Sequence, residues 1–329
     1  MTFDILCAGL ATYDTLLSPI PEDIMQKDGA IAQEVRTGSG GDAVNTAISL
    51  AKLGIRVCVC GCVGDDSFAD IIQSDLERAG ACADGLVREP GLFTNAPVVL
   101  VSPTGERHII RTAKGGNRFF NSGHIARRLL ENTRHLHIAS VNMLPGLDGE
   151  PLAELFRTAH ELGIGTSMDA SFDREGLWLK RIEPALRHCD IFIPSYQEAT
   201  HYAGSEDLEE ITRTFSKYGL KYFGVKLGAD GVFVTDFERR HFLPSFFRGK
   251  PVDTTGAGDA FFAGFLAGYL RDMDLPLCAA LGSAQAASVM RAVGANRSAG
   301  SWEDAVSCLR ENGYDLPRRD TADETGKLQ

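Results

Sequence analysis

The residues best placed to do chemistry stand where a run of small residues is followed by a carboxylate. Gly256, Ala257 and Gly258 carry almost no side chain, so their backbone N–H groups can approach an anion closely. The next segment, 259–270, is predicted to be a helix with Phe262, Ala263, Leu266 and Leu270 recurring on one face, and a helix N-terminus attracts phosphate. Asp259 would lie in the first turn, where a carboxylate can accept the proton of an attacking hydroxyl. The pattern predicts phosphoryl transfer, and an Asp-capped glycine turn is the structural alternative.

Strand-like apolar stretches alternate with amphipathic helices along the chain and would position this site. One such helix, 42–53, follows the Gly40–Gly41 turn and ends at Gly54, as a helix with a glycine C-cap should. This alternation predicts an α/β fold with a mainly parallel sheet covered by helices on both faces. The strands are expected near residues 3–9, 56–62, 135–139, 164–168, 190–193 and 221–226.

Three segments depart from the alternating pattern. Residues 10–37 fit no helix–strand unit, and residues 92–111 contain two apolar runs around Ser102-Pro103-Thr104-Gly105, which predicts a β-hairpin. Residues 314–329 turn polar and charged, so we expect a disordered tail there.

Composition narrows the class of protein. The chain has 329 residues, 44% of them hydrophobic, and a formal net charge of −11, which disfavours binding to nucleic acid or to an anionic membrane. The N-terminus lacks the pattern of a secretory signal, and no apolar run approaches the roughly 20 residues that cross a bilayer. We therefore expect a cytoplasmic protein. Its eight cysteines form no CxxC pair, and Cys58, Cys60 and Cys62 alternate along a predicted strand as small buried hydrophobes would.

Several blocks resemble the ribokinase-like (PfkB) carbohydrate kinases. Asp253-Thr254-Thr255-Gly256-Ala257-Gly258-Asp259-Ala260-Phe261 resembles the C-terminal signature of that family, and Gly38-Ser39-Gly40-Gly41-Asp42-Ala43-Val44-Asn45-Thr46-Ala47 is similar to its sugar-binding turn and helix. Blocks at 61–66, 193–199 and 225–231 are similar to further family elements in the same order. The resemblance covers roughly residues 3 to 300. It implies a ribokinase-like three-layer sandwich, a single kinase domain over 1–313, with 10–37 and 92–111 forming a small β-sheet lid that could also hold a homodimer together.

The resemblance also implies an activity, ATP-dependent phosphorylation of a small sugar. Asp259 would be the catalytic base, and the amides of residues 256–258 would stabilise the transferring phosphoryl group. Asp42 replaces the lysine found in ribokinases, which puts ribose in doubt as the substrate. It would also repel a phosphorylated or carboxylated sugar unless Arg107, Arg111, Lys114 or Arg118 compensated. The sugar-binding residues implied are Asp14, Gly41, Asp42 and Asn45.

Nucleotide and metal sites are implied as well. Glu198 would position Mg²⁺ largely through water, although Ser195 stands where the family has asparagine. The residues expected to line the nucleotide are Lys226, Gly228 and Ser283. A possible K⁺ site would use mostly backbone carbonyls from Asp253, Thr255, Val289, Gly294 and Ser298.

Three other functions would also be carried by an α/β protein: a dinucleotide-binding oxidoreductase, a non-catalytic sensor and a nucleoside kinase. A dinucleotide-binding oxidoreductase is disfavoured because Gly9-Leu10-Ala11-Thr12-Tyr13 lacks the three-glycine fingerprint, and no P-loop is present. A non-catalytic sugar or nucleotide sensor could use the same fold. A nucleoside kinase is the alternative within the family, because a base could stack in a lid pocket built from Tyr13, Leu16, Phe93 or Val98.

Overall fold

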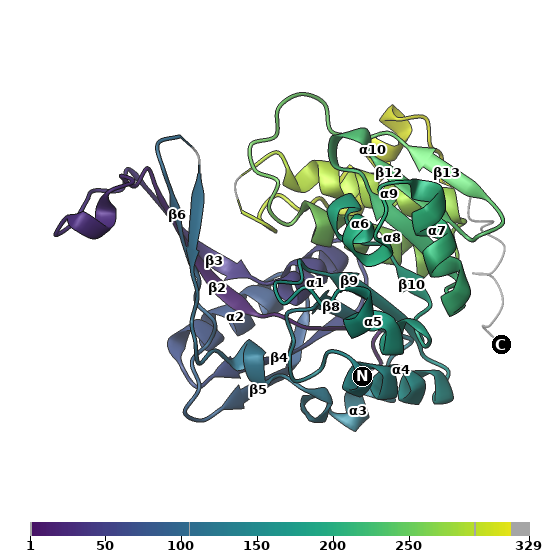
Figure 1. Ribbon diagram of the computed structural model, residues 1–329, viewed down its shortest axis with the longest axis horizontal. Coiled ribbons are helices and arrows are strands. Elements are labelled where there is room, and N and C mark those ends of the chain that lie inside the picture. Colours follow the sequence, from purple (N-terminus) through teal and green to yellow (C-terminus); the bar gives the residue numbers. More distant parts are fainter. Residues whose placement is uncertain (1, 105, 293, 317–329) are drawn as a thin grey trace, which may run out of the picture.

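A computed structural model describes residues 2–104, 106–292 and 294–316. Within those residues the centre of the molecule is a nine-stranded sheet in which all neighbours are parallel except β12, which is antiparallel to both of its neighbours (Figure 1). In sheet order the strands are β13 (Arg240–Leu243), β12 (Val232–Thr235), β11 (Tyr222–Lys226), β10 (Ile191–Phe192), β9 (Gly165–Ala170), β8 (His135–Val141), β1 (Ile5–Ala8), β4 (Val57–Gly64) and β5 (Cys82–Glu89).

Helices cover both faces of this sheet, so the predicted three-layer sandwich is confirmed. One layer contains α1 (Asp42–Lys52), α2 (Ser67–Arg78), α8 (Ala257–Tyr269), α9 (Leu275–Val289) and α10 (Trp302–Glu311). The other contains α3 (Arg127–Leu130), α4 (Glu150–Glu161), α5 (Leu179–Leu186), α6 (Tyr196–Ala203) and α7 (Leu208–Phe215). Short 3-10 turns are η1 (Ile24–Gln26), η2 (Gly116–Phe119), η3 (Ser122–His124), η4 (Ser216–Tyr218) and η5 (Gly228–Asp230).

The strands supply both cores because successive side chains of a strand point to opposite faces. On β1, Ile5 and Cys7 pack with the layer of α1 and α8, whereas Leu6 and Ala8 pack with the layer of α4. The cysteines of β4 follow the same rule and join the core beneath α4. All eight cysteines of the chain are free, six of them buried and two partly buried, as expected for small hydrophobes.

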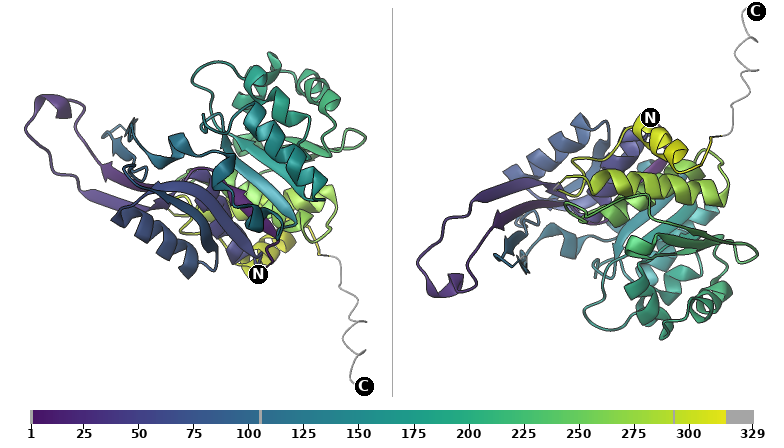
Figure 2. Two further views of the ribbon diagram at one scale, coloured as in Figure 1. Left: turned by 90° about the horizontal axis from the view of Figure 1, so that it is seen from below. Right: turned by 90° about the horizontal axis from the view of Figure 1, so that it is seen from above.

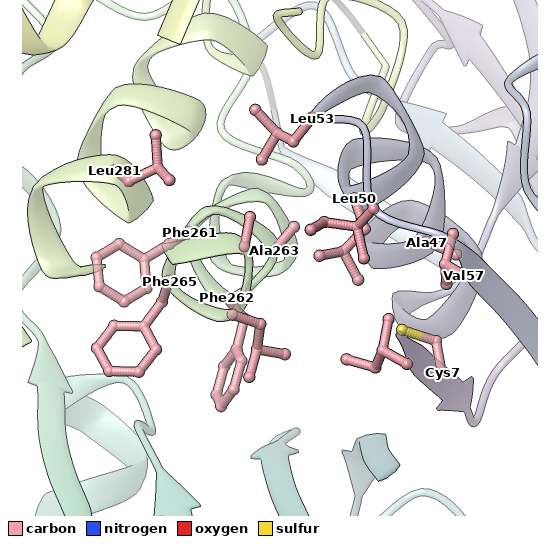
Figure 3. Close-up of a cluster of buried hydrophobic side chains, with 14 of the residues drawn as sticks. Cys7, Ala47, Leu50, Leu53, Val57, Phe261, Phe262, Ala263, Phe265 and Leu281 are labelled. Atoms are coloured by element: carbon pink, nitrogen blue, oxygen red, sulfur yellow. The ribbon is translucent and has the colours of Figure 1, made fainter. Parts of the chain in front are cut away.

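Helix α8, which begins the predicted site, lies in the middle of its layer. Phe262, Ala263, Leu266 and Leu270 are all buried, and burial extends around the whole helix, since every residue from Ala260 to Gly268 is buried. Figure 3 shows the reason: Ala263 faces Leu50 of α1, while Phe261 lies toward Leu281 of α9. A helix packed against a sheet and two other helices has no side left for solvent.

A second, smaller sheet forms the predicted lid. Four described strands build it in the order β3 (Glu34–Gly40), β2 (Thr12–Ser18), β6 (Val98–Val101) and β7 (Arg107–Ile110). The expected hairpin is the antiparallel pair β6–β7, and β2 with β3 forms a long arm that projects from the body (Figure 2). Strand β3 ends at Gly40, and only Gly41 separates it from α1.

The structure has more strands than the sequence predicts, and part of the expected disordered tail is packed against the body. Strand β5 and the antiparallel pair β12–β13 extend the sheet beyond the predicted strands. Of the expected tail, Tyr314 packs on Phe246 with ring centroids 5.6 Å apart, and residues 317–329 lie outside the described part. In the described part no helix is long and apolar enough to span a bilayer.

The contact between α8 and α9 depends on Gly264. A Cβ at this position would lie 2.4 Å from the carbonyl oxygen of Leu281, which is backbone and cannot turn aside. We predict that Gly264→Ala lowers the free energy of unfolding by about 1–3 kcal/mol through overpacking, although alanine is the better helix former. Gly29→Ala, with nothing within 4 Å of its Cβ, is the control in denaturant unfolding. A Gly264→Ala protein as stable as this control would contradict the prediction.

Candidate active site

The turn before α8 is held in a conformation that only glycine adopts easily. Gly256 has φ = 78°, and a Cβ there would lie 2.3 Å from the carbonyl oxygen of Ala295. The N–H of Ala257 donates to the Thr254 carbonyl oxygen at 3.2 Å, whereas the N–H groups of Gly256 and Gly258 find no acceptor among the described residues. Two of the three predicted amides are therefore available to an anion.

This turn runs between two cavities. The first, about 380 Å³, is lined by Thr254, Ala257 and Gly258 of the turn, and the second, about 250 Å³, by Asp253 and Thr255. The first cavity is otherwise lined by Ser195, Lys226, Gly228, Ala229, Gly231, Val232, Ser245, Phe246, Phe247, Gly249, Pro251, Phe261, Ser283, Ala286 and Met290. The second is lined by Asp14, Leu16, Arg36, Thr37, Gly38, Ser39, Pro97, Val99, Ile109, Gly294, Ala295, Asn296 and Arg297.

Asp259 lies in the first turn of α8, as predicted, and a chain of amides orients its carboxylate. The Nδ2 group of Asn45 donates to Oδ2 of Asp259 at 2.8 Å. The Oδ1 atom of Asn45 accepts in turn from Nδ2 of Asn296, at 2.9 Å, and Asn296 lines the second cavity. The base predicted from the sequence is thus linked to that cavity through two asparagines.

Negative charge near Asp259 affects its protonation. Burial raises its pKa well above the usual value, and the nearby Asp42 carboxylate raises it further. Asp42 also contributes, after burial, to the raised pKa of Asp14 and of Asp169. The Asp42 carboxylate accepts hydrogen bonds from Ser140 Oγ at 2.5 Å and Ser171 Oγ at 3.1 Å, which hold its side chain in place.

Lys226 is the cation within this acidic group. Its Nζ donates to Oδ1 and Oδ2 of Asp169 at 2.8 and 2.7 Å, and lies 3.4 Å from the position of a Cβ on Gly258. Burial alone would lower the pKa of Lys226, but the carboxylates of Asp169, Glu198 and Asp259 outweigh it and raise that pKa. Burial raises the pKa of Asp169 to about 6 in spite of the lysine. The ammonium group therefore stands beside the turn that would hold phosphate.

Ser195 and Glu198 form the start of α6. Ser195 is the N-cap, and the N–H of Ser195 donates to Oε2 of Glu198 at 2.8 Å in a capping box. Serine in place of the family asparagine therefore keeps the helix capped and still lines the first cavity. Within the described residues no group of three or more His, Cys, Asp or Glu could hold a metal ion by itself.

The two loops expected to hold K⁺ lie side by side. Oδ1 of Asp253 accepts from the backbone N–H and the hydroxyl of Thr255 at 3.0 and 2.7 Å, and Oδ2 accepts from the N–H of Gly294 at 3.1 Å. Ser298 Oγ donates to the Val289 carbonyl oxygen at 2.9 Å. Thr255 and Gly294 therefore meet at the Asp253 carboxylate, and Val289 and Ser298 are hydrogen-bonded to each other.

The predicted nucleotide-lining residues, Lys226, Gly228 and Ser283, all line the first cavity. Sequence analysis missed its aromatic wall, Phe246 and Phe247, because the segment after β13 has no periodic pattern.

Of the predicted sugar-binding residues, only Asp14 lines the second cavity. Asn45 does not line the cavity but accepts a hydrogen bond from Asn296, which does. Gly41 and Asp42 lie at the start of α1 and do not line the cavity.

The basic and aromatic residues considered for the sugar pocket are placed differently from expectation. Arg111, Lys114 and Arg118 do not line the second cavity, and the side chain of Arg107 lies outside the described part. Arg36 and Arg297 line it instead. Of the residues proposed to stack a base, Leu16 lines the cavity, whereas the Tyr13 ring stacks on Phe68 with centroids 4.9 Å apart, and Phe93 and Val98 are not among the lining residues.

A carboxylate in the first turn of a helix, preceded by a turn that borders two cavities and offers available amides, fits an enzyme that moves a phosphoryl group onto a hydroxyl. Residues 3–302 match the family described as pfkB family carbohydrate kinase. The chain belongs to this family and is a phosphotransferase of the carbohydrate kinase type.

Individual relatives agree with this assignment. A protein of Archaeoglobus fulgidus described as an uncharacterized sugar kinase is 32% identical over 248 residues, which are 75% of this chain and 96% of the relative. An ATP-dependent ribose-1-phosphate kinase of Halopiger xanaduensis is 30% identical over 94% of this chain and 99% of its own length. The structure of Arabidopsis thaliana ribokinase complexed with ribose and ATP has the same fold, with a TM-score of 0.78, 21% identity, and coverage of 94% of this chain and 99% of that one.

The charge of Asp42 should be visible in the pH dependence of catalysis. A catalytic base must be ionised, so with Asp259 as the predicted base we expect activity to fall as pH drops through its pKa, which lies above the value of about 3.9 for a free aspartate. Because Asp42 raises this pKa, Asp42→Asn should move the acid limb of kcat/KM to lower pH, whatever its effect on the maximal rate. Asp84→Asn, on the exposed part of β5, is the control, and equal midpoints in all three proteins would contradict the prediction.

Proposed function

We propose that the protein transfers the γ-phosphate of ATP to a hydroxyl of a small carbohydrate, with Asp259 as the base. The observation that carries the proposal is the turn at 253–258, which borders both cavities and is followed directly by Asp259. The first cavity, with its aromatic wall of Phe246 and Phe247, suits the flat base of ATP. The second, beneath the lid, suits a sugar.

The transfer itself follows from the placement of three groups. Asp259 accepts the hydroxyl proton as that oxygen attacks the γ-phosphorus, and the bond from this phosphorus to the bridging oxygen of ADP breaks. The N–H groups of Gly256 and Gly258 and the ammonium of Lys226 face the negative charge that spreads over the transferring oxygens. Asn45 keeps the Asp259 carboxylate aimed while the proton moves.

The residues present also suit Mg²⁺. This ion is usually held by one or two carboxylates together with substrate phosphates, and Glu198 and Asp169 both act electrostatically on Lys226 at the end of the first cavity. We propose that Glu198 holds the ion largely through water. When bound, Mg²⁺ would neutralise part of the phosphate charge.

The decisive experiment measures ADP release from MgATP with a panel of sugars, sugar acids, sugar phosphates and nucleosides. We expect turnover on sugar acceptors and a loss of at least about 100-fold in kcat for Asp259→Asn, the size expected for removal of a general base. Asp84→Asn should keep wild-type turnover. ATP binding without turnover on any acceptor would instead favour the non-catalytic sensor, and turnover on nucleosides alone would favour the nucleoside kinase.

A monovalent cation is proposed for the paired loops around Asp253. The Asp253 carboxylate accepts hydrogen bonds from the N–H groups of Thr255 and Gly294 and so joins the two loops, whose backbone carbonyls suit a large ion of low charge such as K⁺. The loop at 253–255 continues directly into the turn at Gly256, so a bound cation should order the amides that would bind phosphate. We therefore predict faster turnover in K⁺. Equal rates in Na⁺, K⁺ and ion-free buffer would contradict the prediction.

The outer face of the lid is proposed to pair with the lid of a second copy. Val35 and Ile110 are 62% and 56% exposed on this sheet, and an exposed apolar sheet face commonly marks an interface. Sedimentation should show a dimer at micromolar concentration, and Val35→Lys should weaken it because a charge would enter the interface. A monomer in the wild-type protein would contradict the proposal.

A further inference from the structure

The Asp259 carboxylate is one end of a chain of hydrogen bonds whose other end lies in the lid. The side chain of Asn296 donates from Nδ2 to the backbone carbonyl oxygen of Ser39 at 2.9 Å and to Oδ1 of Asn45 at 2.9 Å. Asn45 in turn donates from Nδ2 to Oδ2 of Asp259 at 2.8 Å. Three segments far apart in the sequence, β3, α1 and the loop after α9, therefore meet at the predicted base.

The direction of these hydrogen bonds is set at both ends of the chain. The Ser39 carbonyl can only accept, and so can an ionised Asp259, so each must be faced by a donor. An amide carries its donors on nitrogen and its acceptor on oxygen. If Asn45 were turned round, its Oδ1 would face the carboxylate, and if Asn296 were turned round, its Oδ1 would face two other oxygens. With Asp259 ionised, only the observed orientation of both amides satisfies the chain.

Asn45 depends on Asn296 for its orientation. Asn45 is 4% exposed, and among the described residues Asn296 is the donor that its Oδ1 finds. A buried oxygen left without a donor costs free energy, so the protein keeps this pairing as long as Asn296 can donate. Without that donor, nothing in the hydrogen bonding holds Oδ1 of Asn45 on the side away from Asp259.

The lid end of the chain is held from two sides. Ser39 lies opposite Tyr13 in the antiparallel pairing of β2 with β3. Its hydroxyl donates to Oδ2 of Asp75, on α2, at 2.6 Å. The backbone carbonyl of Ser39 is therefore a fixed acceptor, and it sets which way the Asn296 amide points.

We infer that Asn296 is a positioning residue for catalysis, which fixes the orientation of Asn45 and thereby directs an N–H donor at the ionised Asp259 carboxylate. The inference rests on the proposed function, in which Asp259 is the base. The effect of Asn296 on the reaction passes through Asn45. Because Ser39 belongs to β3, a strand of the lid helps to aim the base.

The hydrogen bond from Asn45 also favours the ionised form of Asp259. Burial is the largest cause of the raised pKa of Asp259, and the donor on Asn45 acts in the opposite direction. Losing this donor should raise the pKa further and leave less of the base ionised at a given pH. The titratable groups that act on Asp259 from the neighbouring elements are Cys7 of β1, Asp42 of α1, Asp169 of β9 and Lys226 of β11.

The test compares the pH profiles of kcat/KM for Asn296→Asp, Asn296→Ala and the wild type, with a sugar acceptor that the wild type uses. Asn296→Asp keeps the shape of the side chain but has no N–H to donate, so Asn45 should turn its Nδ2 away from Asp259. We expect the acid limb to move up by about one to two pH units and kcat at neutral pH to fall about 10- to 100-fold. Asn296→Ala should move the limb in the same direction by less.

Two controls show that the effect is local. Asn312→Asp adds the same charge at a partly buried amide, whose Nδ2 donates to the Cys308 carbonyl oxygen at 2.8 Å, and it should leave the profile unchanged. The KM for ATP should stay within about threefold in the Asn296 variants, because Asn296 does not line the first cavity.

A double-mutant cycle separates orientation from added charge. If Asn296 acts through Asn45, Asn296→Asp should shift the acid limb little further in a protein that already carries Asn45→Ala. A shift of equal size in both backgrounds would mean that the new carboxylate acts directly on Asp259, and it would overturn the inference. An acid limb that neither Asn296 variant moves would overturn it as well.

The role of Asp259 itself is tested in the same assay by Asp259→Asn. If that variant keeps its turnover, or if no acceptor turns over, the proposed function fails. The inference is then decided by the pKa of Asp259 in a carbon NMR titration of aspartate-labelled protein, with the signal assigned by its absence in Asp259→Asn. A pKa that rises in both Asn296 variants but not in Asn312→Asp would support it, and equal values would overturn it. If Asn296→Asp fails to fold, Asn296→Ala carries the same comparison without the added charge.

Discussion

The constraint on which the site depends is the close contact between Gly256 and the backbone of Ala295. At this point the chain must turn into α8 while another loop crosses it, and a Cβ would lie 2.3 Å from a carbonyl oxygen. The same crossing holds Asp253 against Gly294 and sets the two cavities on either side of one short segment. Because α8 is buried and closely packed between α1 and α9, the position of Asp259 is set by the packing of all three helices.

The packing also brings several charged side chains together around Asp259. The carboxylates of Asp169, Glu198 and Asp259 act on one ammonium group, that of Lys226, so the site holds more negative than positive charge before any phosphate arrives. Such a site raises the pKa of its carboxyls and leaves Asp259 able to take a proton. The positive partial charge that an anionic ligand needs is provided instead by the available amides of Gly256 and Gly258.

Features set by contiguous residues could be predicted from the sequence, and those set by distant pairing could not. The turn at 256–258, the start of α8 near Asp259 and the parallel order of the core strands all follow from local patterns and a family resemblance. Arg36 and Arg297 are 261 positions apart in the sequence and line one cavity only because β3 pairs with β2 beside the loop after α9. The all-round burial of α8 likewise depends on which helices flank it, and its hydrophobic composition alone does not reveal them.

The placement of the cysteines has a practical side. Six of the eight thiols are buried and the other two only partly accessible, and burial raises the pKa of both of these, Cys82 and Cys308. Since the thiolate is the reactive form, the natural protein should resist alkylating reagents near neutral pH. A single cysteine introduced at the tip of the β2–β3 arm would then be the dominant labelling site, and a fluorophore there could report the position of the arm without first removing the native thiols.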